Sequence, residues 1–401
     1  MKYAVILGDG MADYPVESLN GKTPLEVAKK PYIDALSRVS KVGLVKTVPE
    51  GLKPGSDVAN LSVLGYDPFT CYTGRSPLEA ASIGIDLKDN FVTARANLVT
   101  LLGSGEYEDK TMEDYSAGEI TTEEAKELIN YLKERLDDGK YTLYSGVSYR
   151  HCLVAENGRV CGNLTPPHDI SGRKIKDYLP KGDNSEKYLE LMKRSFDLLK
   201  DHPINKERVK RGKNPANSLW FWGEGTKPKL ENFTEKFGIK GAMISAVDLL
   251  KGIAILSGMR VIEVEGATGN YDTNFIGKAK ACLDAFKDVD FVYIHMEAPD
   301  ECGHHGDAEH KIYSIERIDE VVKTVVEGLK KTGEDFKVMI LPDHPTPIAL
   351  RTHVSDPVPF MIFDSRKNSG GKVTSYTEKT AESTGVYVEK GWDLMQELIE
   401  R

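Results

Sequence analysis

The segment Tyr3-Ala4-Val5-Ile6-Leu7-Gly8-Asp9-Gly10 opens the chain with a continuous apolar run that ends in an acidic turn. An uninterrupted apolar run is typical of a parallel strand that is buried on both faces. Residues 289–296, which lead to Asp300, and residues 336–341, which lead to Asp343, repeat this pattern. Apolar residues at helical spacing predict a helix over 312–330 between these two strands, and this order is typical of a parallel crossover unit.

The alternation continues at both ends of the chain. We expect strands at 260–264 and 357–364, the second nearer a sheet edge because of its prolines, and a helix at 242–256 that ends before Gly258. These elements predict an α/β fold with one doubly wound, mostly parallel sheet, built by residues 1–87 and 216–401 together.

The middle of the chain follows a different pattern. Strands expected at 91–102 and 149–155, with a capped amphipathic helix at 121–136, predict an inserted α+β domain over residues 88–215. The basic run at 206–213 is typical of a solvated linker.

Composition narrows the class of protein. The chain has 401 residues, of which 40% are hydrophobic and 29% charged, and its net charge of −9 argues against a nucleic-acid partner. No apolar run is long enough to span a membrane, and the first apolar run lacks the length and cleavage site of a signal peptide. Five scattered cysteines without zinc or redox spacing predict a reducing, cytoplasmic location. The oligomeric state is not predicted.

Acidic residues follow three of the expected strands, at Asp9, Asp300 and Asp343. The carboxyl ends of parallel strands meet at one edge of a sheet, where active sites form. Three carboxylates brought together without a cation would raise one another's pKa values. Histidines gather in the same part of the chain, and mixed aspartate and histidine sets suit zinc, manganese or similar divalent ions. The pattern therefore predicts a metal site, with these histidines nearby: His295, His304, His305, His310, His344 and His353.

The candidate nucleophile is Ser56, in the segment Lys53-Pro54-Gly55-Ser56-Asp57-Val58-Ala59-Asn60. Gly55 permits an unusual backbone turn, and we expect Ser56 to cap a helix whose backbone N–H groups face a phosphate oxygen. A nearby metal would activate the hydroxyl by lowering its pKa. A plain capping serine is the alternative. The chain contains no G-x-x-x-x-G-K-[ST] phosphate loop.

These residues resemble the alkaline phosphatase superfamily, and their order and spacing resemble the cofactor-independent phosphoglycerate mutases of the shorter, archaeal-type branch. The resemblance implies two divalent metal ions, typically manganese, with zinc or cobalt in relatives. It implies that Asp300, His304 and His353 hold one ion, and that the other is held by Asp9, Ser56, Asp343 and His344.

The resemblance also implies a reaction on a small, phosphorylated, anionic substrate. Ser56 would take the phosphate of 3-phosphoglycerate as a phosphoserine intermediate and return it to the other hydroxyl. The inserted domain would grip the carboxylate and close the cleft. The longer bacterial mutases carry an arginine pair in the strand that matches 218–225, and no arginine lies there. Candidates for the substrate contacts, with Asp169 as a possible base, are Arg150, His151, His168, Asp169 and Lys240, and further Arg75 and Arg95.

Three other functions stay open. A homoserine kinase-like phosphotransferase of threonine biosynthesis would send the phosphate to a different hydroxyl, and a metal-dependent phosphatase would send it to water. A non-enzymatic binding protein on the same scaffold is a third possibility, against which the complete set of metal-site residues argues.

Overall fold

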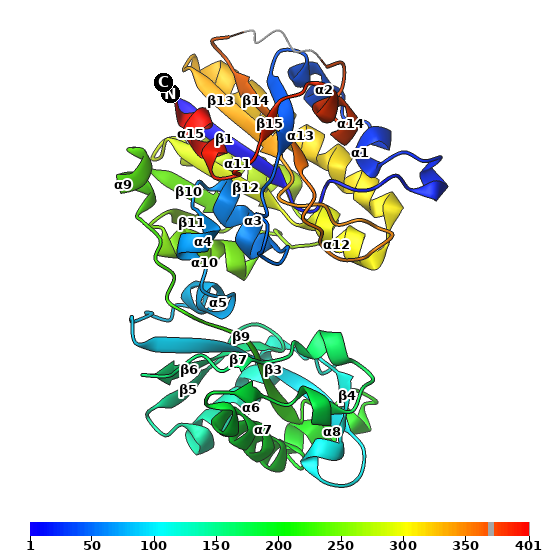
Figure 1. Cartoon of the computed structure of the whole chain (residues 1–401), viewed down its shortest axis with the longest axis vertical. Coiled ribbons are helices and arrows are strands. Elements are labelled where there is room, and N and C mark those ends of the chain that lie inside the picture. The colour runs from blue at the N-terminus through cyan, green and yellow to red at the C-terminus, as the bar shows by residue number, and fades with distance from the viewer. Residues whose placement is uncertain (368–372, 401) are drawn as a thin grey trace. The chain divides into compact units, whose positions relative to one another are not determined.

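The structure is a computed structural model that describes residues 1–367 and 373–400 and divides into two compact units. Met1–Tyr72 and Lys229–Arg401 form the first unit, and Thr73–Pro228 form the second (Figure 1). The segment 88–215 lies wholly within the second unit. The second unit extends beyond the predicted bounds at both ends. Helix α5 (Ser76–Ser82) packs against strand β3 (Phe91–Leu102), and β9 (Ser218–Thr226) pairs with β3.

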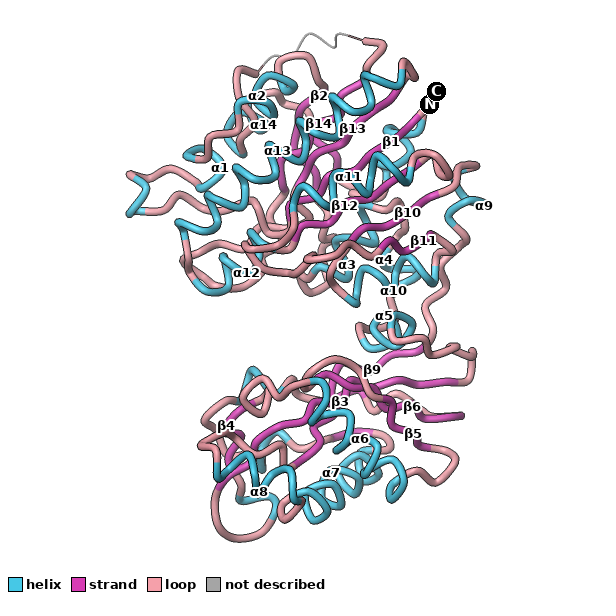
Figure 2. The backbone as a smooth tube through the Cα atoms, turned by 180° about the vertical axis from the view of Figure 1, so that it is seen from behind, coloured by secondary structure: helices cyan, strands magenta, loops and turns pink. Residues whose placement is uncertain are grey.

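The first unit contains an eight-stranded sheet whose described strands are parallel except for β14, which runs against both neighbours. The expected doubly wound, mostly parallel α/β fold is therefore confirmed. Figure 2 shows α11 (Phe275–Ala285) and α13 (Ala308–Thr332) lying across one face of this sheet, where they share its buried core. The strand order is β11 (Arg260–Ile262), β10 (Gly241–Ile244), β12 (Phe291–Met296), β1 (Lys2–Gly8), β13 (Phe336–Leu341), β14 (Val358–Asp364), β2 (Lys41–Val45) and β15 (Tyr387–Val388).

The remaining helices of the first unit surround this sheet and its connections. They are α1 (Pro24–Val27), α2 (Pro31–Ser37), α3 (Ser56–Val63), α4 (Pro68–Cys71), α9 (Phe233–Phe237), α10 (Asp248–Leu256), α12 (Ala298–His305), α14 (Glu378–Ser383) and α15 (Asp393–Ile399).

The second unit contains an antiparallel sheet centred on β3, with one face packed against helices α6 (Thr122–Leu136) and α7 (Ser185–Leu199). Successive side chains along β3 point to opposite faces of the sheet. Ala94, Ala96 and Leu98 therefore face those helices. Arg95 and Asn97 point to the other face. The other elements are β4 (Thr111–Asp114), α6 (Thr122–Leu136), β5 (Tyr141–Tyr144), β6 (Arg150–Glu156), β7 (Gly162–Asn163), β8 (Lys181–Gly182), α7 (Ser185–Leu199) and α8 (Pro203–Lys210).

Several expected elements are confirmed. The strands at 336–341 and 91–102 are β13 and β3, and the helix at 312–330 lies within the longer α13. The helix expected at 121–136 is α6, and the Thr121 side chain caps it by accepting a hydrogen bond from the backbone N–H of Glu124.

Three expectations are wrong. Residues 242–256 do not form one helix, because residues 241–244 are strand β10, buried between β11 and β12, and α10 starts only at Asp248. A short apolar run fits a buried strand as well as a helix. Strand β14 is not near an edge, since β13 and β2 flank it. The basic run is not a linker, because Arg208 is buried and pairs with Glu124.

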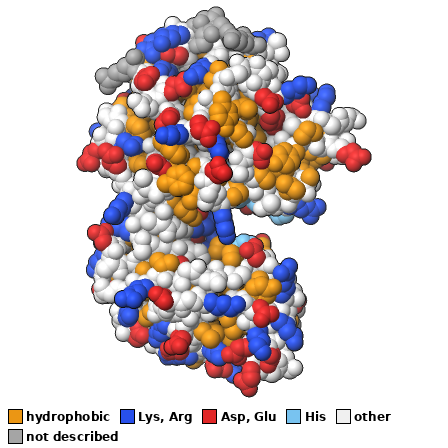
Figure 3. All heavy atoms as spheres, viewed as in Figure 1, with side chains coloured by type: hydrophobic (Ala, Val, Ile, Leu, Met, Phe, Trp, Pro, Cys, Tyr) orange, Lys and Arg blue, Asp and Glu red, His pale blue; other side chains and the backbone are white. Residues whose placement is uncertain are grey.

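Acidic and basic side chains are intermixed over the face of each unit that Figure 3 shows. Among the helices of residues 1–367 and 373–400, none combines the length and the apolar character that a membrane crossing requires.

Candidate active site

Three adjacent parallel strands bring the acidic residues to one edge of the first unit's sheet. β1 lies between β12 and β13, so the carboxyl ends of all three strands meet there. Asp9 directly follows β1, Asp343 follows β13, and Asp300 lies in the first turn of α12, which follows β12. All three carboxylates are buried. The predicted convergence of the three strand ends is therefore observed.

One group of ligand-type atoms surrounds Asp300. Its Oδ2 lies 3.2 Å from His304 Nε2, and its Oδ1 lies 3.3 Å from His353 Nε2. The two Nε2 atoms are only 2.8 Å apart. His304 Nδ1 lies 3.0 Å from the carbonyl oxygen of Arg351, which can only accept, so Nδ1 carries a proton. Burial opposes protonation of the second nitrogen, but the Asp300 carboxylate outweighs it and raises the pKa of His304 to about 9, so a cation would take the place of the proton on Nε2. Lone pairs and carboxylate oxygens that converge in this way suit a cation.

A second group surrounds His344. Its Nε2 lies 3.2 Å from Ser56 Oγ, 3.6 Å from Asp9 Oδ1 and 3.5 Å from Asp343 Oδ2. Ser56 is the first residue of α3 and Gly55 is the N-cap, so the capping position predicted for Ser56 is wrong by one residue. Gly55 has a φ of 179°, which is extended backbone, and the unusual turn expected there is not observed.

The electrostatics of the cluster also suit divalent cations. Burial raises the pKa of Asp9 well above its ordinary value, and the charges of Asp343 and Asp300 raise it further. Asp9 Oδ1 is buried and has no hydrogen-bond partner among the described residues. Burial also opposes ionisation of Asp300, but His304 and His353 outweigh it and hold the pKa of Asp300 well below its usual range. Groups of three such residues lie close enough together to hold divalent metal ions.

Several supporting residues were missed by the sequence analysis. The Asn60 side-chain amide donates to Asp343 Oδ2 and to the Ser56 carbonyl, both at 2.8 Å, and accepts from the Tyr293 hydroxyl at 2.5 Å. The Thr346 hydroxyl donates to Asp300 Oδ1. The four-residue spacing of Ser56 and Asn60, which places them on one helix face, could have indicated Asn60.

Two further buried groups support the site: His295, which the sequence analysis named only as a nearby histidine, and Lys311, which it missed. His295, at the end of β12, faces Asp9. Lys311, in α13, donates to Asp13 Oδ2 at 2.6 Å and to the Thr346 carbonyl at 2.8 Å, which ties the helix to the turn after β13.

The candidate substrate residues are divided between the two units, since Lys240 belongs to the first and the other four to the second. Arg150 is exposed at the start of β6, whereas burial, aided by Arg150 and Arg95, lowers the pKa of His151 to about 3, so that His151 is neutral. His168 Nε2 lies 3.5 Å from Asp169 Oδ1 in the same unit. Lys240 precedes β10 at the amino edge of the first unit's sheet, opposite the ligand cluster, and does not join it. Strand β10 was not predicted, because its residues had been assigned to the helix expected at 242–256.

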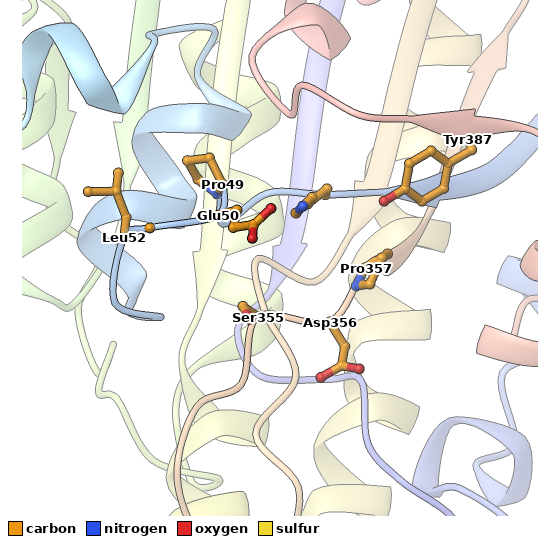
Figure 4. Close-up of a pocket in the computed structure, with 9 residues that line it drawn as sticks. Pro49, Glu50, Leu52, Ser355, Asp356, Pro357 and Tyr387 are labelled. Atoms are coloured by element: carbon orange, nitrogen blue, oxygen red, sulfur yellow. The ribbon is translucent and has the colours of Figure 1, made fainter.

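A separate pocket of about 400 Å³ lies in the first unit between residues 46–52 and 355–357 (Figure 4). Tyr387 lies at one side of it, and Glu50 and Asp356 line it. None of its nine lining residues belongs to the proposed ligand set.

Comparison with known proteins identifies relatives of the whole chain. The family profile described as "2,3-bisphosphoglycerate-independent phosphoglycerate mutase" matches residues 37–205. The "Probable 2,3-bisphosphoglycerate-independent phosphoglycerate mutase" of Geobacter sulfurreducens is 49% identical, and the 2,3-bisphosphoglycerate-independent phosphoglycerate mutase of Methanothrix thermoacetophila is 50% identical; each alignment covers 100% of both chains.

Two solved structures are similar over nearly the full length. The PH0037 protein of Pyrococcus horikoshii matches with a TM-score of 0.82 and 30% identity, covering 99% of this chain and 96% of its own. The cofactor-independent phosphoglycerate mutase of Thermoplasma acidophilum matches with a TM-score of 0.64 and 27% identity, covering 100% and 99%. On the strength of the full-length relatives, the chain belongs to the 2,3-bisphosphoglycerate-independent phosphoglycerate mutase family.

Proposed function

We propose that this protein interconverts 3-phosphoglycerate and 2-phosphoglycerate and that Ser56 carries the phosphate between the two half-reactions. The observation that carries the proposal is the position of Ser56 Oγ, 3.2 Å from His344 Nε2 and next to the buried aspartate and histidine cluster. The names of the full-length relatives favour the mutase over a homoserine kinase or a phosphatase.

Two divalent metal ions would be held by the two groups already described. One would lie with Asp300, His304 and His353, and the other would be held by Asp9, Ser56, Asp343 and His344. Manganese is the proposed metal, with zinc or cobalt as substitutes, since mixed carboxylate and imidazole sets suit all three. When bound, such ions lower the pKa of a coordinated hydroxyl and offset the charge of the phosphoryl group.

The chain's own residues prepare Ser56 for attack. Asn60 holds the Ser56 carbonyl and the Asp343 carboxylate together, which fixes the first turn of α3 against the turn after β13.

In the first half-reaction, Ser56 Oγ forms a bond to phosphorus, the bond to the substrate's 3-oxygen breaks, and the proton that Ser56 loses is balanced by one gained at that oxygen. In the second, the glycerate 2-hydroxyl attacks the phosphoserine, gives up its proton and restores Ser56.

The second unit is proposed to bind the glycerate. Candidate contacts there are Arg150, His151, His168 and Asp169, with Asp169 as a base for the accepting hydroxyl. The glycerate must stay bound between the half-reactions, because water reaching the phosphoserine would hydrolyse it. We also propose a cytoplasmic location, which the five free and buried cysteines support.

A substrate comparison tests this proposal. Protein loaded with manganese should convert 3-phosphoglycerate to 2-phosphoglycerate without added 2,3-bisphosphoglycerate, should release little inorganic phosphate and should not phosphorylate homoserine with ATP. Phosphate release that keeps pace with substrate loss would identify a phosphatase instead. Phosphohomoserine as the main product would identify the kinase.

A further inference from the structure

Arg351 has a backbone conformation that residues other than glycine rarely adopt. Its φ is +55°, in the left-handed region. This conformation is unfavourable for a residue with a Cβ, and it persists only where the surrounding contacts stabilise it. The contacts that Arg351 makes therefore indicate its role.

The left-handed residue lies in a short loop, residues 345–354, that is closed by hydrogen bonds. The backbone N–H of Val354 donates to the Pro345 carbonyl at 3.1 Å, and the N–H of Arg351 donates to the Pro347 carbonyl at 2.8 Å. Proposed metal ligands stand at both ends of this loop. The backbone of Arg351 is therefore fixed in place beside the ligand cluster.

The carbonyl group of Arg351 faces helix α12. Its oxygen lies 3.0 Å from Nδ1 of His304, whereas Nε2 of the same ring lies 3.2 Å from Asp300 Oδ2 and 2.8 Å from His353 Nε2. A carbonyl oxygen that accepts from the outer ring nitrogen of a histidine ligand fixes the tautomer and the orientation of the ring. The direction of this carbonyl depends on φ at residue 351, so an ordinary φ would turn it away from His304.

The side chain of Arg351 contacts the end of the same helix. Gly306 is the C-cap of α12, and a Cβ added to it would lie 2.8 Å from Arg351 Nε and 3.0 Å from Arg351 Nη2. The guanidinium group therefore lies directly against the Gly306 backbone, where the last carbonyl groups of the helix carry partial negative charge. Arg351 thus holds α12, which carries Asp300 and His304, through both its backbone and its side chain.

We propose that Arg351 is a positioning residue for the metal ion held by Asp300, His304 and His353. This inference rests on the metal site of the proposed function, but it does not depend on the identity of the substrate. The left-handed backbone directs the carbonyl to His304, and the guanidinium group holds the end of α12 beside it. The unfavourable backbone at Arg351 keeps the imidazole oriented before an ion binds.

Manganese titration of the full chain, followed by calorimetry, tests this role. Arg351→Val should weaken the binding of one of the two ions by about 10–100-fold, because a β-branched residue resists the left-handed region and the carbonyl then leaves His304. Arg351→Gly should weaken it by less than about fivefold, since glycine adopts this φ freely and only the side-chain contact is lost. His353→Ala, which removes a ligand of the same proposed ion, identifies the affected binding event.

Asn20→Val is the matched control. Asn20 has a φ of +57° in an exposed turn of the first unit, where its backbone N–H donates to the Glu17 carbonyl. The substitution introduces the same β-branched side chain into the same backbone region. Denaturant unfolding should therefore show a loss of stability similar to that of Arg351→Val, while the affinities for both manganese ions stay unchanged.

Arg351→Pro is a second variant that changes the backbone directly. The proline ring fixes φ at about −65°, so the carbonyl cannot keep its direction and the same ion should bind more weakly. Folded Arg351→Val and Arg351→Pro proteins that bind both ions as tightly as the wild type would overturn the inference.

The outcome is distinguishable from a failure of the proposed function. If the wild type binds both ions and Arg351→Val binds one of them more weakly, but the wild type does not interconvert the phosphoglycerates, the mutase proposal fails and the positioning role stands. If the wild type interconverts them and Arg351→Val binds both ions with wild-type affinity, the positioning role fails alone. Wild-type protein that binds no manganese would overturn both the proposed metal site and this inference.

Discussion

Nε2 of His295 lies 2.8 Å from Oδ2 of Asp9, and both side chains are fully buried. Ser245 Oγ lies 3.2 Å from the other ring nitrogen of His295, so the imidazole is held on both sides. The contact occupies one oxygen of Asp9 and leaves Oδ1, which has no partner among the described residues, directed toward His344. His295 thereby positions the carboxylate that the proposed second metal ion would use.

Replacing His295 by alanine should weaken binding at one of the two proposed metal sites. Loss of a partner that orients a metal ligand typically costs about 10–100-fold in metal affinity. Manganese titration followed by calorimetry measures the effect, and His295→Asn, which can still donate to Asp9, should recover part of it. His310→Ala, which removes a histidine outside the ligand cluster, is the control. Equal affinities at both sites in His295→Ala and the wild type would show that His295 does not position Asp9.

Position 10 requires glycine for two reasons: its backbone is left-handed, and neighbouring atoms leave no space for a Cβ. Its φ is +59°, and an added Cβ would lie 2.6 Å from Thr346 Oγ1 and 2.7 Å from the Asp300 backbone. We expect Gly10→Ala to lower the free energy of unfolding by more than the roughly 1 kcal/mol that a left-handed backbone alone costs a non-glycine residue. Gly21→Ala supplies the comparison, since Gly21 has a φ of +72° and no atom within 4 Å of the added Cβ. Denaturant unfolding of both variants measures the difference, and equal losses would contradict the packing argument.

The ion pair between Lys311 and Asp13 is almost completely buried. Breaking a buried pair by removing one partner costs about 3–5 kcal/mol, because the other charge is left without compensation. Lys311→Met should therefore destabilise the first unit strongly, and the double variant Lys311→Met with Asp13→Asn should recover part of the loss. Lys193→Met, which removes a partly exposed pair with Glu108, should cost about 0–1 kcal/mol. A small loss in Lys311→Met would show that this pair contributes little to stability.

Glu378 should make stability depend on pH. Burial raises its pKa from 4.5 to about 7, although hydrogen bonds from Thr23 and the Asp13 backbone oppose the shift. Between these two values the folded protein keeps a proton that the unfolded chain releases, so the free energy of unfolding should fall as pH rises, by up to about 3 kcal/mol. Glu378→Gln should flatten this dependence, and Glu382→Gln, at an exposed position of the same helix, should not. Parallel pH profiles for wild type and Glu378→Gln would contradict the assignment.

Asp9, Asp300, Asp343 and His344 could be predicted because each follows a buried apolar strand, and His304 lies one helical turn from Asp300. Ser56, at the start of α3, and His353 do not directly follow such a strand, and the family resemblance supplied the ligand role predicted for both. Asp9, Asp300 and Asp343 are fixed by local patterns that are visible in the chain. Lys240 could not be placed because the four apolar residues that follow it fit a strand and a helix equally well. Pairing partners such as Glu79 and Arg95, 16 residues apart, depend on tertiary contacts that no local pattern encodes.

The proposed mechanism requires a phosphate that is covalently bound to Ser56 during turnover. Protein loaded with manganese, mixed with 3-phosphoglycerate and quenched in acid within one turnover, should yield a Ser56 peptide carrying one phosphate by mass spectrometry. Ser56→Ala should give no phosphopeptide and no turnover while retaining metal. An active Ser56→Ala protein, or turnover by the wild type with no phosphate on this peptide, would contradict the phosphoserine mechanism.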